Sequence, residues 1–225
     1  MGEPAGNVLP IYFESGSMSG DIGELNRGLV SLLDELLCYP MAASKVRFCV
    51  MGFADDAVSY LEPADLRDVE AMPTLSARGS TSYAAAFRAL HQRIPNDVRA
   101  LKGQNYLVNR PAVFFLTAGA PNPGDGWERS HADLTDPGFG PRPNILAFGI
   151  GKADGDVIKR VATSPQYAFI TAKGTDTGVA IAEFIKALTQ SVISSGQALA
   201  SGTASLQVAQ PPNFISLGVD IVGEC

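Results

Sequence analysis

Apolar runs of strand length alternate with helical patterns along most of this 225-residue chain. The apolar runs cover residues 8–13, 46–53, 57–61, 112–117, 144–150 and 167–171. Most of them are apolar at successive positions rather than at every second one, which is typical of strands buried on both faces. Strands that alternate with helices predict a mostly parallel sheet covered on both sides, an open doubly wound α/β fold in three layers.

The clearest helical pattern covers residues 21–38, where leucines recur on one broad face. Further helices are expected at 81–94, 127–134, 156–162 and 177–194, and Pro95 is expected to kink or interrupt the first of these. Only Ala54-Asp55-Asp56 separates the runs at 46–53 and 57–61. This short connection predicts an antiparallel hairpin at the edge of the sheet.

The chain is expected to divide into a domain over residues 1–194 and an extension over residues 195–225. Residues 195–210 are small and polar, which is typical of a linker. Residues 214–222 are apolar and predict a strand that pairs with the body of the protein, because a bare apolar strand invites aggregation.

Composition excludes several classes of function. A net charge of −6 without clustered Lys and Arg argues against a nucleic-acid partner. The sequence shows neither a secretory signal nor an apolar run of membrane-spanning length, so we expect a cytoplasmic protein with no membrane partner. The three cysteines lack metal-ligand spacing, and Cys38 and Cys49 are expected to be buried thiols.

Small hydroxyl residues follow the ends of several predicted strands. The run Glu14-Ser15-Gly16-Ser17 follows the first strand, Thr81 precedes a helix, and Thr117-Ala118-Gly119 ends a later strand. The carboxyl ends of parallel strands meet at one edge, where open α/β sheets bind ligands. These residues are therefore expected to lie close together, although Ser and Thr also cap helices and close turns in any protein.

These segments, in this order, resemble a von Willebrand factor A (vWA) domain, and in particular the bacterial TerY-like branch associated with tellurium resistance and stress. The resemblance rests on Leu9-Pro10-Ile11-Tyr12, the Ser-Gly-Ser-Met run, Gly79-Ser80-Thr81-Ser82, Phe115-Leu116-Thr117 and residues 144–151. It implies a metal-ion-dependent adhesion site (MIDAS) in which two serines, a threonine and two aspartates hold Mg²⁺. Ser15 and Ser17 match the serines, and Thr81 matches the threonine.

The site that this resemblance implies lacks both of its aspartates. Phe13 and Ala118 stand where the two carboxylates are expected. Neutral hydroxyls compensate poorly for the water that a divalent ion must shed, so we predict a degenerate site with weak or absent Mg²⁺ binding. Glu14 neighbours the lost position and would replace the first carboxylate if the strand rearranged, but adjacent strand residues point to opposite faces.

The single tryptophan, Trp127, lies with Arg129 in a segment near the predicted site. Two roles remain open for it. The indole either closes the start of a helix over the core or, with Arg129, contacts a protein partner on the rim, since Trp and Arg are enriched in binding hot spots.

The sequence favours a non-enzymatic protein-interaction module that docks its partner at the carboxyl edge of the sheet. The resemblance implies an adaptor of a bacterial stress or conflict system, with a phosphatase or a protein kinase encoded nearby as partner. Hydrolase motifs fail, because Met18 occupies the centre of the run that outlines a nucleophile elbow. The alternative is a metal-dependent regulatory or hydrolytic enzyme that uses a displaced carboxylate such as Glu14 or Asp125.

Overall fold

A mixed sheet forms the centre of the protein. The computed structural model describes residues 5–16, 18 and 20–218. The strands are β1 (Asn7–Gly16), β2 (Val46–Phe53), β3 (Ala57–Ala64), β4 (Leu107–Val108), β5 (Ala112–Thr117), β6 (Asn144–Gly149), β7 (Ala168–Thr171) and β8 (Phe214–Ser216). Their order is β3-β2-β1-β5-β6-β7-β8, and the short β4 pairs with β1. The inner pairs are parallel and the pairs at both edges are antiparallel, which confirms the predicted fold class.

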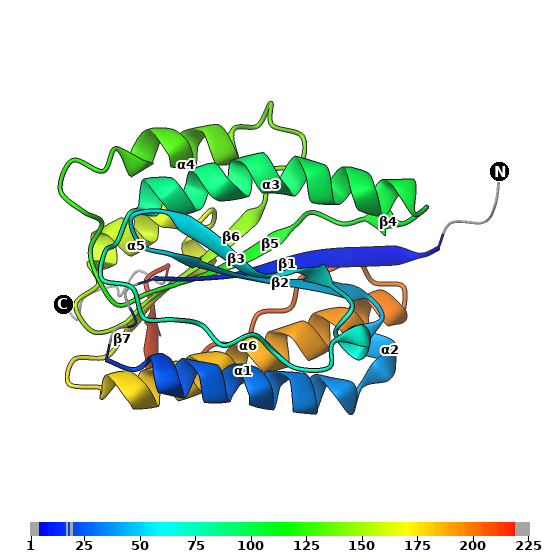
Figure 1. Ribbon diagram of the computed structural model, residues 1–225, viewed down its shortest axis with the longest axis horizontal. Coiled ribbons are helices and arrows are strands. Elements are labelled where there is room, and N and C mark those ends of the chain that lie inside the picture. Colours follow the sequence, from blue (N-terminus) through cyan, green and yellow to red (C-terminus); the bar gives the residue numbers. More distant parts are fainter. Residues whose placement is uncertain (1–4, 17, 19, 219–225) are drawn as a thin grey trace, which may run out of the picture.

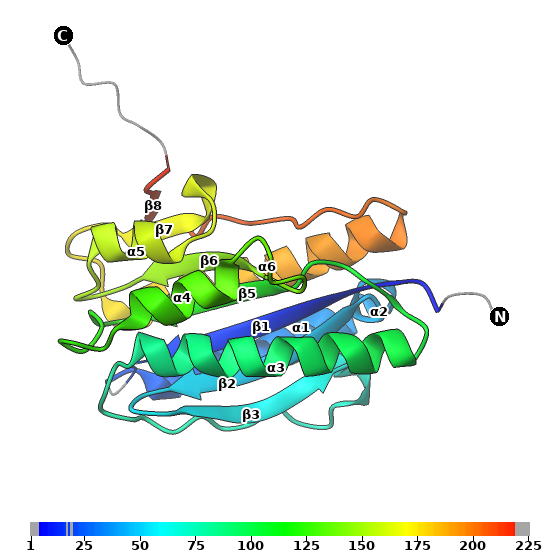
Figure 2. The same cartoon turned by 90° about the horizontal axis from the view of Figure 1, so that it is seen from above.

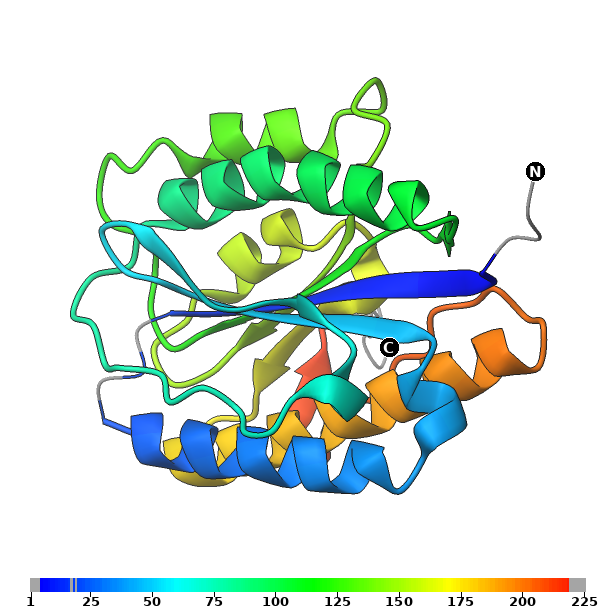
Figure 3. The ribbon, with the colours of Figure 1, turned by 45° about the vertical axis from the view of Figure 1, so that its right-hand side comes forward.

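Helices cover both faces of this sheet. Helices α3 (Tyr83–Gly103), α4 (Trp127–Thr135) and α5 (Gly155–Val161) lie on one face, and α1 (Ile22–Leu37), α2 (Pro40–Ala43) and α6 (Thr177–Ala200) lie on the other (Figures 1 and 3). Two 3-10 turns, η1 (Leu66–Asp68) and η2 (Pro165–Tyr167), complete the described elements. The three-layer architecture therefore has two apolar cores, one on each side of the sheet.

The side chains of strand β1 alternate between these two cores. Phe13 belongs to the core shared with α1 and α6, whereas Tyr12 belongs to the core beneath α3 and α4. Each β1 residue from Leu9 to Gly16 pairs in parallel register with β2, and Ile11 to Gly16 also pair with β5. The strand is hydrogen-bonded on both sides, so its register fixes which side chains reach each face.

The predicted hairpin at one edge is present. Strands β2 and β3 are antiparallel, and β3 lies at the edge of the sheet. The third predicted strand continues to Ala64, three residues beyond its expected end.

The predicted end of the second helix near Ile94 is wrong, because Pro95 does not terminate it. Helix α3 continues through Pro95 to Gly103. An interior proline costs about 3 kcal/mol because it removes one hydrogen bond and crowds the preceding turn. Ile94 and Leu101 are buried on either side of it, and this packing outweighs the local cost.

The predicted linker is wrong over residues 195–200, which continue α6 to Ala200. Their small side chains serve close packing: Ser195 is buried, and a Cβ at Gly196 would lie 2.4 Å from the backbone oxygen of Ala42. The segment that follows returns along the helix, where Gln207 N–H donates to Ser195 Oγ at 2.8 Å. Composition alone does not separate a flexible linker from a tightly packed small-residue helix.

The predicted C-terminal strand pairs with the body of the protein. Strand β8 runs antiparallel to β7, with Ile215 opposite Ile170. Residues 219–222 of the predicted strand lie outside the described residues.

The two described cysteines differ in burial. Cys49 is buried as expected, and burial raises the pKa of its thiol to about 12. The expectation for Cys38 is wrong: its thiol is exposed, because it follows the last turn of α1 beyond the helix's buried face.

In the part of the chain that the structure covers, none of the helices is apolar over a length that would cross a bilayer.

Candidate site at the carboxyl edge of the sheet

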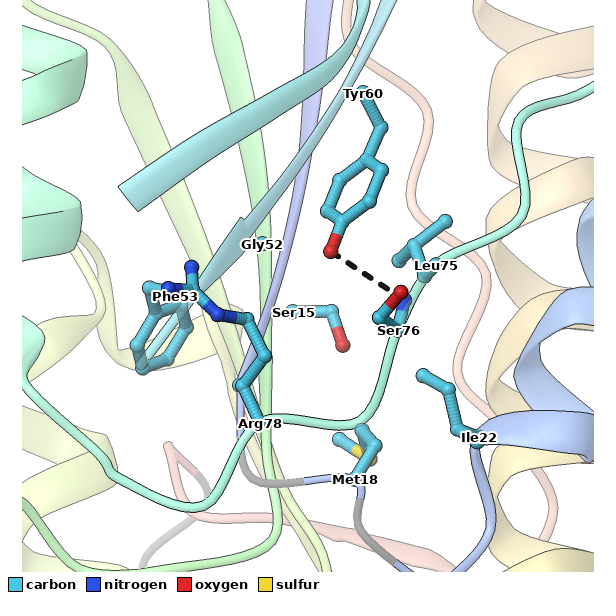
Figure 4. A pocket seen from close by; sticks show the side chains of 10 residues that line it. Ser15, Met18, Ile22, Gly52, Phe53, Tyr60, Leu75, Ser76 and Arg78 are labelled. Carbon is cyan, nitrogen blue, oxygen red and sulfur yellow. Dashed lines mark hydrogen bonds between the residues drawn. The ribbon is translucent and has the colours of Figure 1, made fainter. Parts of the chain in front are cut away.

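Ser15 lies near the end of β1, where the loops of the carboxyl edge converge. Its neighbours in the sheet are Gly52 of β2 and Leu116 of β5, and Ser15 is 5% exposed. Ser15 lines a small hollow whose other walls come from the hairpin, from the start of α1 and from residues 75–78 (Figure 4). The hollow has a volume of about 20 Å³, which is room for one or two water-sized groups.

A cation and further hydroxyl groups border the same hollow. The Tyr60 hydroxyl accepts a hydrogen bond from Ser76 N–H at 3.4 Å (Figure 4). The guanidinium of Arg78 pairs through Nη2 with Asp56 at 2.5 Å, while its Nη1 is buried without a hydrogen-bond partner. The hollow is therefore lined by hydroxyl groups and by one arginine, which suits a small anionic or neutral acceptor group better than a metal cation.

Thr81 lies at the same edge, directly before α3, and is 9% exposed. Its N–H donates to Asn122 Oδ1 at 3.2 Å, and Asn122 N–H donates back to Thr81 O at 3.0 Å. Asp125 accepts from Ser82 Oγ at 2.6 Å and from Ala84 N–H at 2.8 Å. The loop after β5 is thus tied to the start of α3, because Asp125 Oδ2 caps a backbone N–H of that helix while Oδ1 holds the hydroxyl of the N-cap residue Ser82.

The two positions that lack aspartate belong to the apolar core. Phe13 is fully buried, and its ring packs against Phe184 of α6 with centroids 5.7 Å apart. Ala118 is half-buried against the same core. Ser17, the second predicted serine, lies outside the described residues.

Glu14 reaches the opposite face of the sheet. Its side chain is fully buried, and neither carboxylate oxygen has a hydrogen-bond partner. Burial raises the pKa of this carboxyl well above its usual range, and the charge of Arg93 opposes the shift only in part. Phe13 and Glu14 alternate across the sheet as strand geometry requires, so Glu14 does not join Ser15 at the candidate site.

The donors at this edge do not fit a tightly held Mg²⁺ ion. Magnesium requires octahedral oxygen ligands and is usually held through one or two carboxylates. Ser15 and Thr81 contribute hydroxyls, whereas Asp125 already caps a helix and Glu14 faces away. Across residues 5–16, 18 and 20–218, no group of three His, Cys, Asp or Glu side chains is arranged to hold a metal.

Trp127 and Arg129 lie in different surroundings. Trp127 is 5% exposed, its ring packs edge-on to Tyr83 with centroids 6.0 Å apart, and Arg160 covers it at 4.9 Å. Arg129 is exposed on the same helix. Burial favours the core role for the indole, while contact of Arg129 with a partner stays a prediction.

Sequence reasoning missed Arg78 and Tyr60 at this site. Arg78 directly precedes the Gly79-Ser80-Thr81 motif, so its position in the sequence was a usable signal. Tyr60 lies on the edge strand β3, and its approach to residue 76 depends on the path of a loop with no regular pattern.

The sheet order, the helices on both faces and the hydroxyl residues at the carboxyl edge together define a vWA-like α/β fold. Solved structures share this fold. Proximal thread matrix protein 1 from the mussel byssus is 17% identical, with a TM-score of 0.53 over 85% of this chain and 48% of that one. The pilus adhesin SpaC from Lactobacillus rhamnosus GG is 13% identical, with a TM-score of 0.64 over 85% of this chain and 31% of that one.

A further structure of the mussel protein, also 17% identical and with a TM-score of 0.53, has a zinc-occupied MIDAS motif. It matches 84% of this chain and 46% of its own length. The chain thus spans about half the length of the mussel protein and about a third of the adhesin. No family profile matches the sequence, and no curated protein matches it either.

Proposed function

We propose that this chain is a non-enzymatic protein-interaction module that docks a protein partner at the carboxyl edge of its sheet without a bound metal ion. The observation that carries the proposal is which side chains occupy that edge. The hydroxyls of Ser15 and Thr81 lie there, whereas a buried Phe13 and a half-buried Ala118 occupy the positions where the vWA resemblance expects metal-binding carboxylates.

The hollow beside Ser15 supports docking without a metal. Arg78 lines this hollow and supplies a positive charge on a side chain that is 34% exposed. A partner group that is negatively charged or accepts hydrogen bonds would pair with the accessible part of this guanidinium. The hollow is too small for a cofactor, so it would receive one group from a larger surface.

The biological setting follows from the TerY-like resemblance and is part of the proposal. We infer an adaptor role in a bacterial stress or conflict system, in the cytoplasm, with a phosphatase or a protein kinase as the partner. A hydrolytic role for the chain itself finds little support, because Asp125 caps α3 and Glu14 is buried on the other face.

Site-specific photocrosslinking tests the docking surface. Gly79 is exposed at the carboxyl edge, and a Cβ there would meet nothing within 4 Å, so a benzophenone side chain fits. The matched control places the same group at Val30, which is 52% exposed on the outer face of α1.

The proposal expects a discrete crosslinked partner from position 79 in the cells that make this protein, equal in yield with Mg²⁺ and with EDTA, and absent from position 30. Crosslinking that requires Mg²⁺, or that is the same from both positions, would overturn it.

A further inference from the structure

A second and larger hollow lies at the amino edge of the sheet, at the other end of the strands from Ser15. Its volume is about 580 Å³, within the range of about 300–1,000 Å³ that is typical of ligand sites. The second half of α3 forms one wall, the segment leading into β5 forms another, and the loop before β6 closes it. Helices α3 and α4, which precede and follow β5 in the sequence, lie side by side over the sheet (Figure 2). The lining residues are Pro95, Val98, Arg99, Lys102, Val108, Asn109, Arg110, Pro111, Gly140 and Pro141.

The charge of this hollow is one-sided. Arg99, Lys102 and Arg110 are exposed on its rim, and no carboxylate lines it. The guanidinium of Arg99 donates to the neutral Asn96 Oδ1 at 3.2 Å, and that of Arg110 donates to the backbone oxygen of Arg142 at 2.8 Å. Among the described residues none of the three cations pairs with an acidic side chain, although the whole chain carries a net charge of −6.

A neighbouring hollow extends this positive surface. It has a volume of about 410 Å³ and is lined by two arginines, Arg110 and Arg142. Arg110 therefore joins two adjacent hollows, and the cationic surface is longer than a single side-chain pocket.

The apolar part of the large hollow is aliphatic. Its lining contains prolines and valines and has no aromatic ring on which a nucleobase would stack. The absence of a stacking ring among the lining residues favours carboxylates interspersed with aliphatic side chains over a nucleotide.

We propose that this amino-edge hollow binds an extended acidic peptide segment of a protein partner. The carboxylates of the peptide pair with Arg99, Lys102 and Arg110, and its aliphatic side chains pack on the proline and valine floor. The site goes beyond the proposed function at the carboxyl edge and does not depend on it. Two docking surfaces at opposite ends of the sheet would let one chain hold two partners together.

A defined peptide tests this site on the full chain. The probe is fluorescein-labelled Glu-Leu-Glu-Leu-Glu-Leu, followed by fluorescence anisotropy and by amide chemical shifts at physiological ionic strength. The site variant is Arg99→Gln/Lys102→Gln/Arg110→Gln. The matched control, Lys159→Gln/Lys173→Gln/Lys186→Gln, removes the same charge from exposed positions elsewhere.

The expected results are saturable binding, shifts confined to residues 95–111 and 140–142, and a rise in Kd of about tenfold in the site variant, against less than about twofold in the control. Equal losses in both variants, no saturable binding, or shifts centred on residues 15, 52 and 78 would overturn the proposal. Inorganic phosphate that displaces the peptide at equal concentration would also overturn it, in favour of a phosphate site. Crosslinking from position 79 is measured separately in the same variants and distinguishes failure here from failure at the carboxyl edge.

Discussion

The ring of Phe13 on β1 packs against the ring of Phe184 on α6, with centroids 5.7 Å apart. A carboxylate at position 13 would face the same core, where its charge would be costly to bury. The position where the vWA resemblance expects an aspartate is therefore a core position in this chain, and Phe13 contributes to the packing of α6 on the sheet.

Truncation of Phe13 measures this packing. Phe13→Ala is expected to lower the free energy of unfolding by about 3–5 kcal/mol, because it removes a fully buried ring and leaves a cavity. Urea unfolding followed by circular dichroism checks the change. Val30→Ala on the exposed face of α1 is the control and should stay within about 0.5 kcal/mol of the wild type.

Glu14 should make stability depend on pH. Its folded-state pKa is raised by burial, so the folded protein retains a proton that the unfolded chain releases above the ordinary pKa of glutamate. Stability must then fall as pH rises from that ordinary value toward the folded-state pKa, by at most about 1.4 kcal/mol per pH unit from this group.

Glu14→Gln removes this titration. Urea unfolding at several pH values between 5 and 8 should show that the free energy of unfolding of the variant rises relative to that of the wild type as pH increases. Glu35→Gln, on the exposed side of α1, should follow the wild type throughout. A Glu14→Gln curve parallel to that of the wild type would mean that Glu14 is ionised in the folded protein.

Gly196 tests whether the end of α6 belongs to the packed domain. A Cβ there would lie 2.4 Å from the backbone oxygen of Ala42. The change Gly196→Ala stabilises the helix by about 1 kcal/mol through propensity. The added methyl group collides with backbone atoms that cannot rotate away, and this overpacking destabilises the fold by about 1–3 kcal/mol. We expect a net loss of thermal stability. Gly103→Ala, which has open space, should be neutral or slightly stabilising.

Trp127 and Arg129 separate packing from partner contact. Trp127→Ala should cost about 3–5 kcal/mol, because the indole is buried against Tyr83 and Phe87. Arg129→Ala should leave the melting temperature unchanged and, if Arg129 lies on the partner-binding rim, weaken crosslinking from position 79. Unchanged crosslinking in Arg129→Ala would contradict that role.

The sequence was most informative where physical constraints are local. Strand-length apolar runs located β2 and β5 at their observed bounds, and the short connection at residues 54–56 gave the edge hairpin. It failed where tertiary packing decides. Pro95 is carried through α3 by buried neighbours, and the small residues after position 194 prolong α6 because they allow close approach to α2.

The candidate site was predictable in part. Motif order placed Ser15 and Thr81 at one edge, and alternation along β1 predicted that Glu14 would face away from Phe13. The role of Asp125 as a helix cap and the approach of Arg78 to the hollow depend on loop paths that have no periodic signal. The amino-edge hollow was not predictable for the same reason, because its cations come partly from α3 and partly from an irregular segment.

Calorimetric titration of Mg²⁺ tests the central claim, that this vWA-like domain works without a metal at its carboxyl edge. The wild type is titrated beside Ser15→Ala/Thr81→Ala, which removes the described hydroxyl ligands. We predict that neither protein gives a saturable heat at millimolar Mg²⁺. Saturable binding by the wild type that is lost in the double variant would contradict the account.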